Sequence, residues 1–384
     1  MAAISLRVTV IDPALDPEAP VWGDAAGGWQ PAGVAWMSLL AAAGVPVGGD
    51  GGLAIVANPD ATPDAADRAR REGRAVLIGP PPDDPVEALA AVRDALGALV
   101  RPDLRGVLVL RLDDPGSSMK RHLAGWAHDD VTAAAWEALW RALDGFGRAS
   151  IFCCPAWVDA DGRTRPSRQA NPDEWAAIDR GVGWGLADLE CHGYTHVDPD
   201  VGAWTAAPDR FTSEDWYREL RPPRLDHEPS VAQQARLLAQ WRAACGPGTT
   251  LVAPGEAWGL NTLAAAGGNG FELFNSWSVC RLRQPGPVPL FVTGVESPYL
   301  DQADPRWLAN GLPAVGYWHD RDMAVHGPGW VPEQLAAWRD CGATRAWAFA
   351  DLARAWATPI DAALVDGQVT VRRAPPVPLL IEPA

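Results

Sequence analysis

Short apolar runs alternate with amphipathic stretches along the first hundred residues. Runs at 4–11, 53–57 and 75–78 predict buried strands, and the stretches between them carry helical spacing. Gly- and Pro-rich segments such as 80–85 separate the elements, as loops do. This alternation is typical of βαβ units, so residues 1–103 predict a small doubly wound α/β domain of the flavodoxin or Rossmann kind. The region has no glycine-rich phosphate-binding motif, and its role stays open.

A second and longer series of the same kind begins at residue 107, where VLVLRL predicts a buried strand. Further strands are expected at 149–153, 185–189, 250–253, 291–295, 314–318 and 345–350. About seven strand–helix units indicate a closed or nearly closed barrel, which we assign to residues 104–360. Residues 361–384 are rich in β-formers and proline, and we expect them to form a tail packed on the outside of the barrel.

Composition excludes several classes of function. The formal net charge is −16, which would repel a nucleic acid. Lys120 is the single lysine, which argues against Schiff-base chemistry or a phosphate-binding lysine. The six cysteines form no CxxC pair, so a cysteine-rich zinc site is not expected. Apolar windows of membrane-spanning length and a secretion signal are lacking, so we expect a cytoplasmic protein without a membrane partner.

Polar side chains close several of the expected strands. Asp113 and Asp114 follow VLVLRL, His192 and His196 follow the strand at 185–189, and a late strand leads into His319. In a parallel barrel the functional residues lie at the carboxyl ends of the strands. Two histidines four residues apart, with a carboxylate from another strand end, can hold a catalytic metal with open positions.

Each feature has a simpler interpretation when taken alone. An Asp-Asp pair at a strand end is usually a solvated turn or a helix cap, and an HxxxH pair is as often the exposed face of a helix. A lone histidine usually makes local hydrogen bonds and has no catalytic role. The combination of three strand ends in one order favours a functional site over these alternatives.

The order of these motifs resembles that of a known family. LRLDDPG, then CHGYTH about 80 residues later, then a strand ending in APG and a late strand ending in histidine are similar to the polysaccharide deacetylase superfamily, the NodB-homology fold of carbohydrate esterase family 4. The resemblance covers roughly residues 105–355. It implies a NodB-like distorted (β/α)7-type barrel, preceded here by the small α/β domain.

The resemblance also implies roles for the strand-end residues. Asp113 would be the general base and His319 the catalytic acid. A divalent metal would be held by Asp114, His192 and His196. Zinc is the first expectation for the ion, with cobalt, nickel and manganese as alternatives.

Other positions depart from the family pattern or line its groove. Pro254 and Trp258 fall where the third motif lines the groove, and Glu256 stands there in place of the usual arginine. Arg111 shares a strand face with Asp113, so it is expected to pair with that carboxylate or to meet an anionic substrate group. His326 competes with His319 for the role of acid, and we count it among the substrate-side residues.

These observations lead to a hypothesis of a cytoplasmic, metal-dependent hydrolase. It would remove an acetyl group from an amino sugar or a related small molecule. We expect no nucleic-acid partner, and a homo-oligomer is one expectation for its assembly. One alternative is a metal-dependent enzyme of the same fold with different chemistry. Another is a catalytically inactive barrel that binds carbohydrate.

Overall fold

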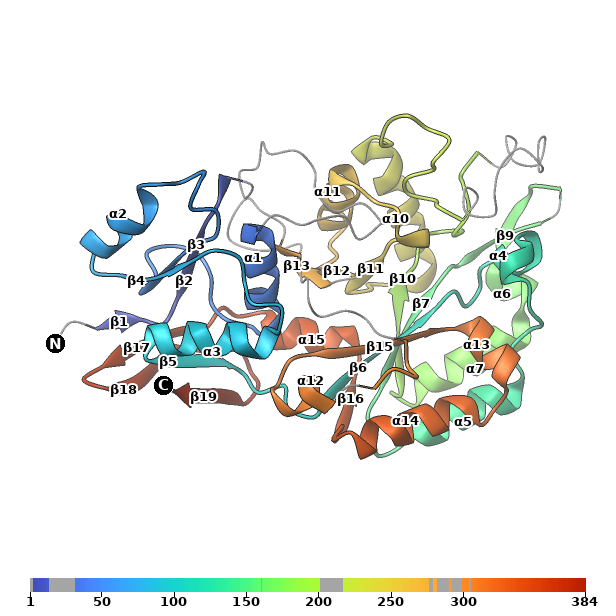
Figure 1. The fold of residues 1–384 in the computed structure, drawn as a ribbon. Coiled ribbons are helices and arrows are strands. Elements are labelled where there is room, and N and C mark those ends of the chain that lie inside the picture. Colours follow the sequence, from blue (N-terminus) through green and yellow to red (C-terminus); the bar gives the residue numbers. More distant parts are fainter. Residues whose placement is uncertain are drawn as a thin grey trace.

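The computed structural model describes residues 3–13, 32–159, 161–200, 217–275, 279–281, 290–291, 299–303 and 305–384, and it is a mixed α/β structure (Figure 1). No helix among these residues has both the length and the apolar character that a bilayer crossing needs.

The larger part of the molecule is built on a nine-stranded sheet in the order β14-β13-β12-β11-β10-β7-β6-β15, with β16 also paired to β6. Its seven parallel strands are β6 (Val107–Asp113), β7 (Ala149–Cys153), β10 (Ala187–Cys191), β11 (Thr250–Val252), β12 (Leu273–Asn275), β15 (Ala314–His319) and β16 (Arg345–Trp347). Two antiparallel strands, β13 (Val279–Arg281) and β14 (Leu290–Phe291), extend one edge.

The parallel sheet predicted from the sequence is therefore present. Within the described residues no strand pairing joins the two ends of the path, so the sheet is an open half-barrel there rather than the closed barrel that was one expectation. The strand expected at 291–295 meets β14 only at Phe291, and residues 292–298 lie outside the described part of the chain.

Strand β6 is buried along its whole length, because both faces of a parallel sheet are covered. Leu108, Leu110 and Leu112 point into the main hydrophobic core. Successive residues of a strand face opposite sides. Arg111 and Asp113 therefore lie on the other face, which carries polar groups at the end of the strand.

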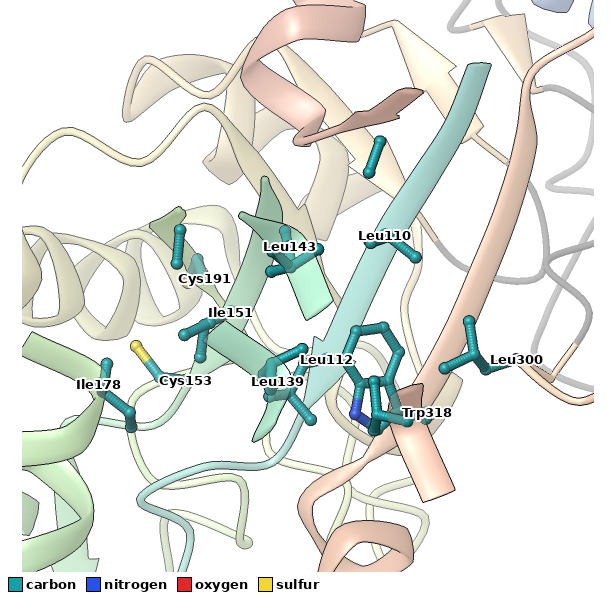
Figure 2. Packing of buried hydrophobic residues seen from close by; sticks show 14 of the residues in the cluster. Leu110, Leu112, Leu139, Leu143, Ile151, Cys153, Ile178, Cys191, Leu300 and Trp318 are labelled. Atoms are coloured by element: carbon teal, nitrogen blue, oxygen red, sulfur yellow. The ribbon is translucent and has the colours of Figure 1, made fainter. Parts of the chain in front are cut away.

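Helices cover the outer face of this sheet. The main ones are α5 (Ala133–Leu143), α7 (Pro172–Gly183), α10 (Val231–Cys245) and α14 (Trp330–Asp340). Helix α5 starts where the Thr132 side chain accepts a hydrogen bond from the amide of Ala135, and it buries Trp136, Leu139, Trp140 and Leu143 at helical spacing. Figure 2 shows Leu139 and Leu143 of this helix against Leu110, Leu112 and Trp318 of the sheet.

Shorter elements connect these units. They are α4 (Met119–His122), β8 (Ala156–Val158), β9 (Thr164–Pro166), α6 (Ser167–Ala170), α11 (Leu260–Gly268), α12 (Pro305–Ala309), α13 (Asp320–His326), α15 (Phe349–Trp356), and the 3₁₀ turns Ala124–Trp126 and Pro254–Glu256.

The N-terminal part contains a small parallel sheet in the order β2-β3-β4. Its strands are β2 (Val8–Ile11), β3 (Leu53–Val56) and β4 (Ala75–Ile78), with helices α1 (Ala32–Ala42), α2 (Ala65–Arg71) and α3 (Pro85–Leu96). The run at 4–11 forms two strands, since β1 (Ile4–Ser5) ends before β2 begins.

A doubly wound sheet has a point where strand order reverses. The sheet described here has none, so that topology stays a prediction.

The C-terminal tail pairs with the N-terminal part rather than with the large sheet. Strands β17 (Asp361–Val365) and β18 (Gln368–Arg373) form a sheet with β1, and β19 (Leu379–Pro383) pairs with β5 (Ala98–Pro102). The strands pair there because β1 and β5 offer unpaired backbone edges beside a core that Ile360 and Ala362 complete. Val377 of the tail also packs against a cluster that contains Val107 and Phe152 of the large sheet, so the packing of the tail on the barrel stays a prediction. Figure 1 places both chain ends at this end of the molecule.

Candidate active site

A cavity of about 190 Å³ lies at the carboxyl ends of β6, β10 and β15. The described residues that line it are Arg111, Asp113, Asp114, Met119, Trp126, His192, His196, Tyr217, Arg218, Ala253, Gly255, Glu256, Tyr299, Tyr317 and His319. The cavity therefore brings together all of the expected catalytic and metal-ligating residues, although they come from three separate stretches of chain.

Asp114, His192 and His196 converge on one point of this cavity. Asp114 Oδ1 lies 3.1 Å from His192 Nε2 and 3.2 Å from His196 Nε2, and the two Nε2 atoms are 3.1 Å apart. All three side chains are buried. In the described part of the chain this is the one group of three His, Cys, Asp or Glu side chains whose ligand atoms lie so close together.

The triangle of donors has dimensions that suit a first-row divalent metal. With bonds of about 2.1 Å, two ligand atoms are about 3.0 Å apart at a right angle and about 3.4 Å apart at the tetrahedral angle. The three observed separations fall between these values. Asp114 Oδ1 is also buried without a hydrogen bond, which leaves it available as a ligand. The residues present therefore fit a metal ion.

The backbone around the two aspartates explains how both reach one cavity. Asp114 has a left-handed φ of 79° and Gly116 a φ of 85°, so the chain turns sharply at the end of β6. The amide of Asp114 donates to the carbonyl of Phe152, which fixes the turn against β7. A Cβ on Gly116 would lie 2.4 Å from the carbonyl oxygen of Cys154, so the turn requires glycine there.

The electrostatics of the triad follow from burial and from the close approach of its members. Burial alone would raise the pKa of the Asp114 carboxyl, but His196 and His192 beside it hold that pKa well below its ordinary value. Burial would lower the pKa of His192, but Asp113 and Asp114 raise it. The other ring nitrogen of His192, Nδ1, lies 3.1 Å from the carbonyl of Val252 and donates a hydrogen bond to it. Nε2 then carries the lone pair, which faces Asp114 and His196.

Arg111 forms an ion pair with Asp113, which was one of the two arrangements expected from the sequence. Its Nε lies 2.9 Å from both carboxylate oxygens, and its Nη2 also contacts Asp113. The same guanidinium donates to Asn275 Oδ1 at 3.0 Å and to Glu256 Oε1 at 3.1 Å. Tyr317 stacks against it, with the guanidinium carbon 5.0 Å from the ring centre. Arg111 therefore fixes the orientation of Asp113 from within the same strand.

His319 lies at the end of β15 and faces the same cavity. Its Nδ1 is 3.6 Å from Asp322 Oδ2, and its backbone amide donates to the same oxygen at 2.9 Å. Burial would lower the pKa of His319, but Asp322, Asp114 and Asp113 together raise it to about 9. The ring also makes an edge contact with Trp126, with centroids 5.0 Å apart. An imidazolium at this place is suited to donate a proton.

Three expected residues take other places. Pro254 is buried and does not line the cavity; a Cβ added to Gly193 would lie 2.6 Å from its Cγ. Trp258 is buried against Phe274 in the hydrophobic core. His326 is exposed at the end of α13, where it stacks on Trp330, and it does not line the cavity. Glu256 does line it, through its contact with Arg111.

Sequence reasoning missed four further residues. Tyr317 precedes His319 by two positions, so the period of a strand places both on one face and could have revealed it. Tyr299 packs on Tyr317, and Trp126 packs on His319. Glu219 accepts hydrogen bonds from the loop that carries the two histidines, and no motif in the sequence predicts this contact.

Comparison with known proteins finds similarity to solved structures only. No family model matches the chain, and no curated protein matches it. Among solved structures, it is similar to a family 4 carbohydrate esterase from Streptomyces lividans, with 15% identity over 60% of this chain and 88% of that one and a TM-score of 0.31. It is similar to the chitin deacetylase from Colletotrichum lindemuthianum at 15% identity, 65% and 88% coverage, and a TM-score of 0.34.

A third similar structure is a family 4 pseudoenzyme from Bacillus anthracis, with 10% identity, coverage of 65% of this chain and 66% of that one, and a TM-score of 0.36. These TM-scores are too low for any of the likenesses to assign an activity. The functional conclusion therefore depends on the geometry of the site.

Proposed function

We propose that this protein is a metal-dependent hydrolase that removes an acetyl group from an N-acetylated, sugar-like small molecule. The observation that carries the proposal is the convergence of Asp114 Oδ1, His192 Nε2 and His196 Nε2 within 3.2 Å of one another in a cavity. Asp113 and His319 line the same cavity, so the groups for proton transfer stand beside the donor triangle.

Asp114, His192 and His196 would hold the metal, with zinc as the first expectation and cobalt, nickel or manganese as alternatives. A divalent ion bound there supplies Lewis acidity, which polarises an acyl carbonyl and makes water more acidic.

The proton transfers are assigned to two side chains. Asp113 receives a proton from the attacking water; its carboxylate keeps acceptor positions for this after accepting three hydrogen bonds from Arg111. His319, whose pKa Asp322 and the other acids nearby raise in the metal-free protein, donates a proton to the departing nitrogen. The two residues thus act as base and acid from neighbouring strands.

The shape of the cavity supports a small acyl group. Its volume of about 190 Å³ is below the roughly 300–1,000 Å³ of sites that enclose a drug-sized ligand. Trp126, Tyr299 and Tyr317 line it with His319, and the rings of Tyr299 and Tyr317 pack against the imidazole. An acetyl group fits such a space, while the remainder of the substrate would lie outside it.

The test is release of acetate from a panel of N-acetylated amino sugars by metal-loaded and chelator-treated protein. We expect release only with metal, and a loss of about 10²–10⁴-fold in Asp113→Asn and His319→Asn. His326→Asn is the matched control and should retain activity. No acetate from any member of the panel, with carbohydrate still bound, would favour an inactive binding barrel. A different product would indicate other chemistry at the same site.

A further inference from the structure

Glu219 is a buried carboxylate surrounded by one short loop. Its Oε2 accepts hydrogen bonds from the amides of Tyr194 at 2.7 Å, Thr195 at 3.2 Å and His196 at 3.2 Å. Its Oε1 lies 3.1 Å from the Thr195 amide and 2.9 Å from the Thr195 hydroxyl. The side chain is about 1% exposed, so these contacts replace the water it has lost.

The loop conformation is built around this carboxylate. Gly193 has a φ of 77° and His196 a φ of 69°, and the left-handed residues turn three successive amides towards one point. Such a concave array of N–H groups is a general anion-binding arrangement of the backbone. A Cβ on Gly193 would lie 2.2 Å from Glu219 Oε2, so the close approach also depends on glycine at 193.

The two histidines of the triad are oriented by different means. His192 is held through its ring, since Nδ1 donates to the Val252 carbonyl. His196 Nδ1 is buried and makes no hydrogen bond among the described residues. Metal-binding histidines usually owe their orientation to a partner of the second ring nitrogen. For His196 the hydrogen bond that the structure shows lies on the backbone, where its amide donates to Glu219 and fixes the main chain that carries the ring.

We propose that Glu219 is a positioning residue for the metal centre, which fixes the 192–196 loop so that His196 presents Nε2 to the ion. The inference rests on the proposed metal site but adds a residue outside the ligand set. Burial raises the pKa of Glu219 to about 7, and the hydrogen bonds from Thr195, Tyr194 and His196 oppose that rise.

The experiment compares Glu219→Gln with Glu190→Gln in the full-length protein. Glu190 is a matched control, because it is also buried and also accepts two backbone hydrogen bonds, from Thr249 at 2.7 Å and Thr250 at 2.6 Å. Co²⁺ is titrated into each metal-free protein, and affinity and the visible absorption bands of the ion are recorded. We expect Glu219→Gln to weaken binding by about 10–100-fold and to alter the bands, and Glu190→Gln to leave both unchanged.

The outcomes separate this inference from the proposed function. If the wild type binds Co²⁺ and both variants bind it equally, the role of Glu219 is refuted while the metal site stands. If the wild type binds no Co²⁺, the proposed function fails and the inference fails with it. Should Glu219→Gln not fold, Thr195→Val decides, since it removes one contact to Glu219 without changing charge; a loss of affinity supports the inference and an unchanged affinity overturns it.

Discussion

His319 and Asp113 are register partners at the ends of the adjacent parallel strands β15 and β6. Tyr317 and Arg111 form the equivalent pair two residues earlier, on the same face. The sheet itself thus sets the spacing between the assigned acid and base. Loop geometry is needed only for Asp114 and the two histidines, where left-handed residues bring the ligands together.

The raised pKa of His319 predicts a specific titration. In the metal-free protein, NMR of the seven histidines should show one imidazole with a pKa near 9. Adding a divalent ion should lower it, since the ion's charge offsets the attraction of Asp114 and Asp113. Asp322→Asn should also lower it, because Asp322 is the nearest acid to its ring. A titration near 6.5 in the wild type that Asp322→Asn leaves unchanged would contradict this assignment.

The same shift predicts how stability depends on pH. Because folding raises the pKa of His319 from 6.5 to about 9, its contribution is complete below about pH 6.5 and is lost as pH rises through about 9. Urea unfolding of metal-free wild type and His319→Asn between pH 6 and pH 10 measures it. The stability difference between the two should shrink with rising pH, and a difference that stays constant would exclude the linkage.

Removal of the Arg111 guanidinium should destabilise the fold. Arg111→Met leaves the carboxylate of Asp113 buried without its main partner, and a broken buried ion pair costs about 3–5 kcal/mol. The double variant Arg111→Met, Asp113→Leu should recover part of the loss, because no unpaired carboxylate then remains at position 113. Guanidinium unfolding of the two single variants and the double variant tests this, and strictly additive losses would show that the two side chains are uncoupled.

Lys120, the single lysine, should be unreactive in the native protein. It is about 2% exposed and lies 3.1 Å from Asp130 and 3.5 Å from Glu174. Burial would lower its pKa, but Glu174, Asp320 and Asp130 raise it, so the amine is also protonated. Peptide mapping after treatment with an amine reagent should find residue 120 modified only in denaturant. If Lys120 of the folded protein reacts as fast as a model amine at the same pH, its burial is refuted.

Metal binding should stabilise the folded protein. A ligand that binds only the folded state at about 100 times its dissociation constant adds about 2.7 kcal/mol. Thermal unfolding with and without Zn²⁺ should therefore show a higher Tm for the wild type. The double variant His192→Ala, His196→Ala should show no such increase, and an equal increase in both proteins would mean that the ion binds elsewhere.

The sequence predicted most of the large sheet because parallel strands buried on both faces are long apolar runs. The strands at 149–153 and 314–318 were found within one residue of their bounds. The polar pairs that close β6 and follow β10 were visible for the same reason, since they interrupt those runs. The structure places them in one cavity.

Other features could not be predicted because they depend on contacts across irregular chain. Glu219 reaches the loop at 194–196 from a segment without periodicity. Trp258 and His326 have residue types that suit a groove, but packing against Phe274 and Trp330 takes them elsewhere. The pairing of the tail at 361–384 with β1 and β5 was not predicted, because strand edges, unlike strand faces, leave no mark in the hydrophobic pattern.

The most direct test is elemental analysis of three purified proteins after reconstitution with Zn²⁺. They are the wild type, the double variant with both His192→Ala and His196→Ala, and the control His326→Ala. The proposed site predicts about one equivalent of metal in the wild type and in the control, and none in the double variant, because the triad loses two of its three ligands. Metal content that is equal in all three proteins, or absent from the wild type, would contradict the metal-dependent hydrolase.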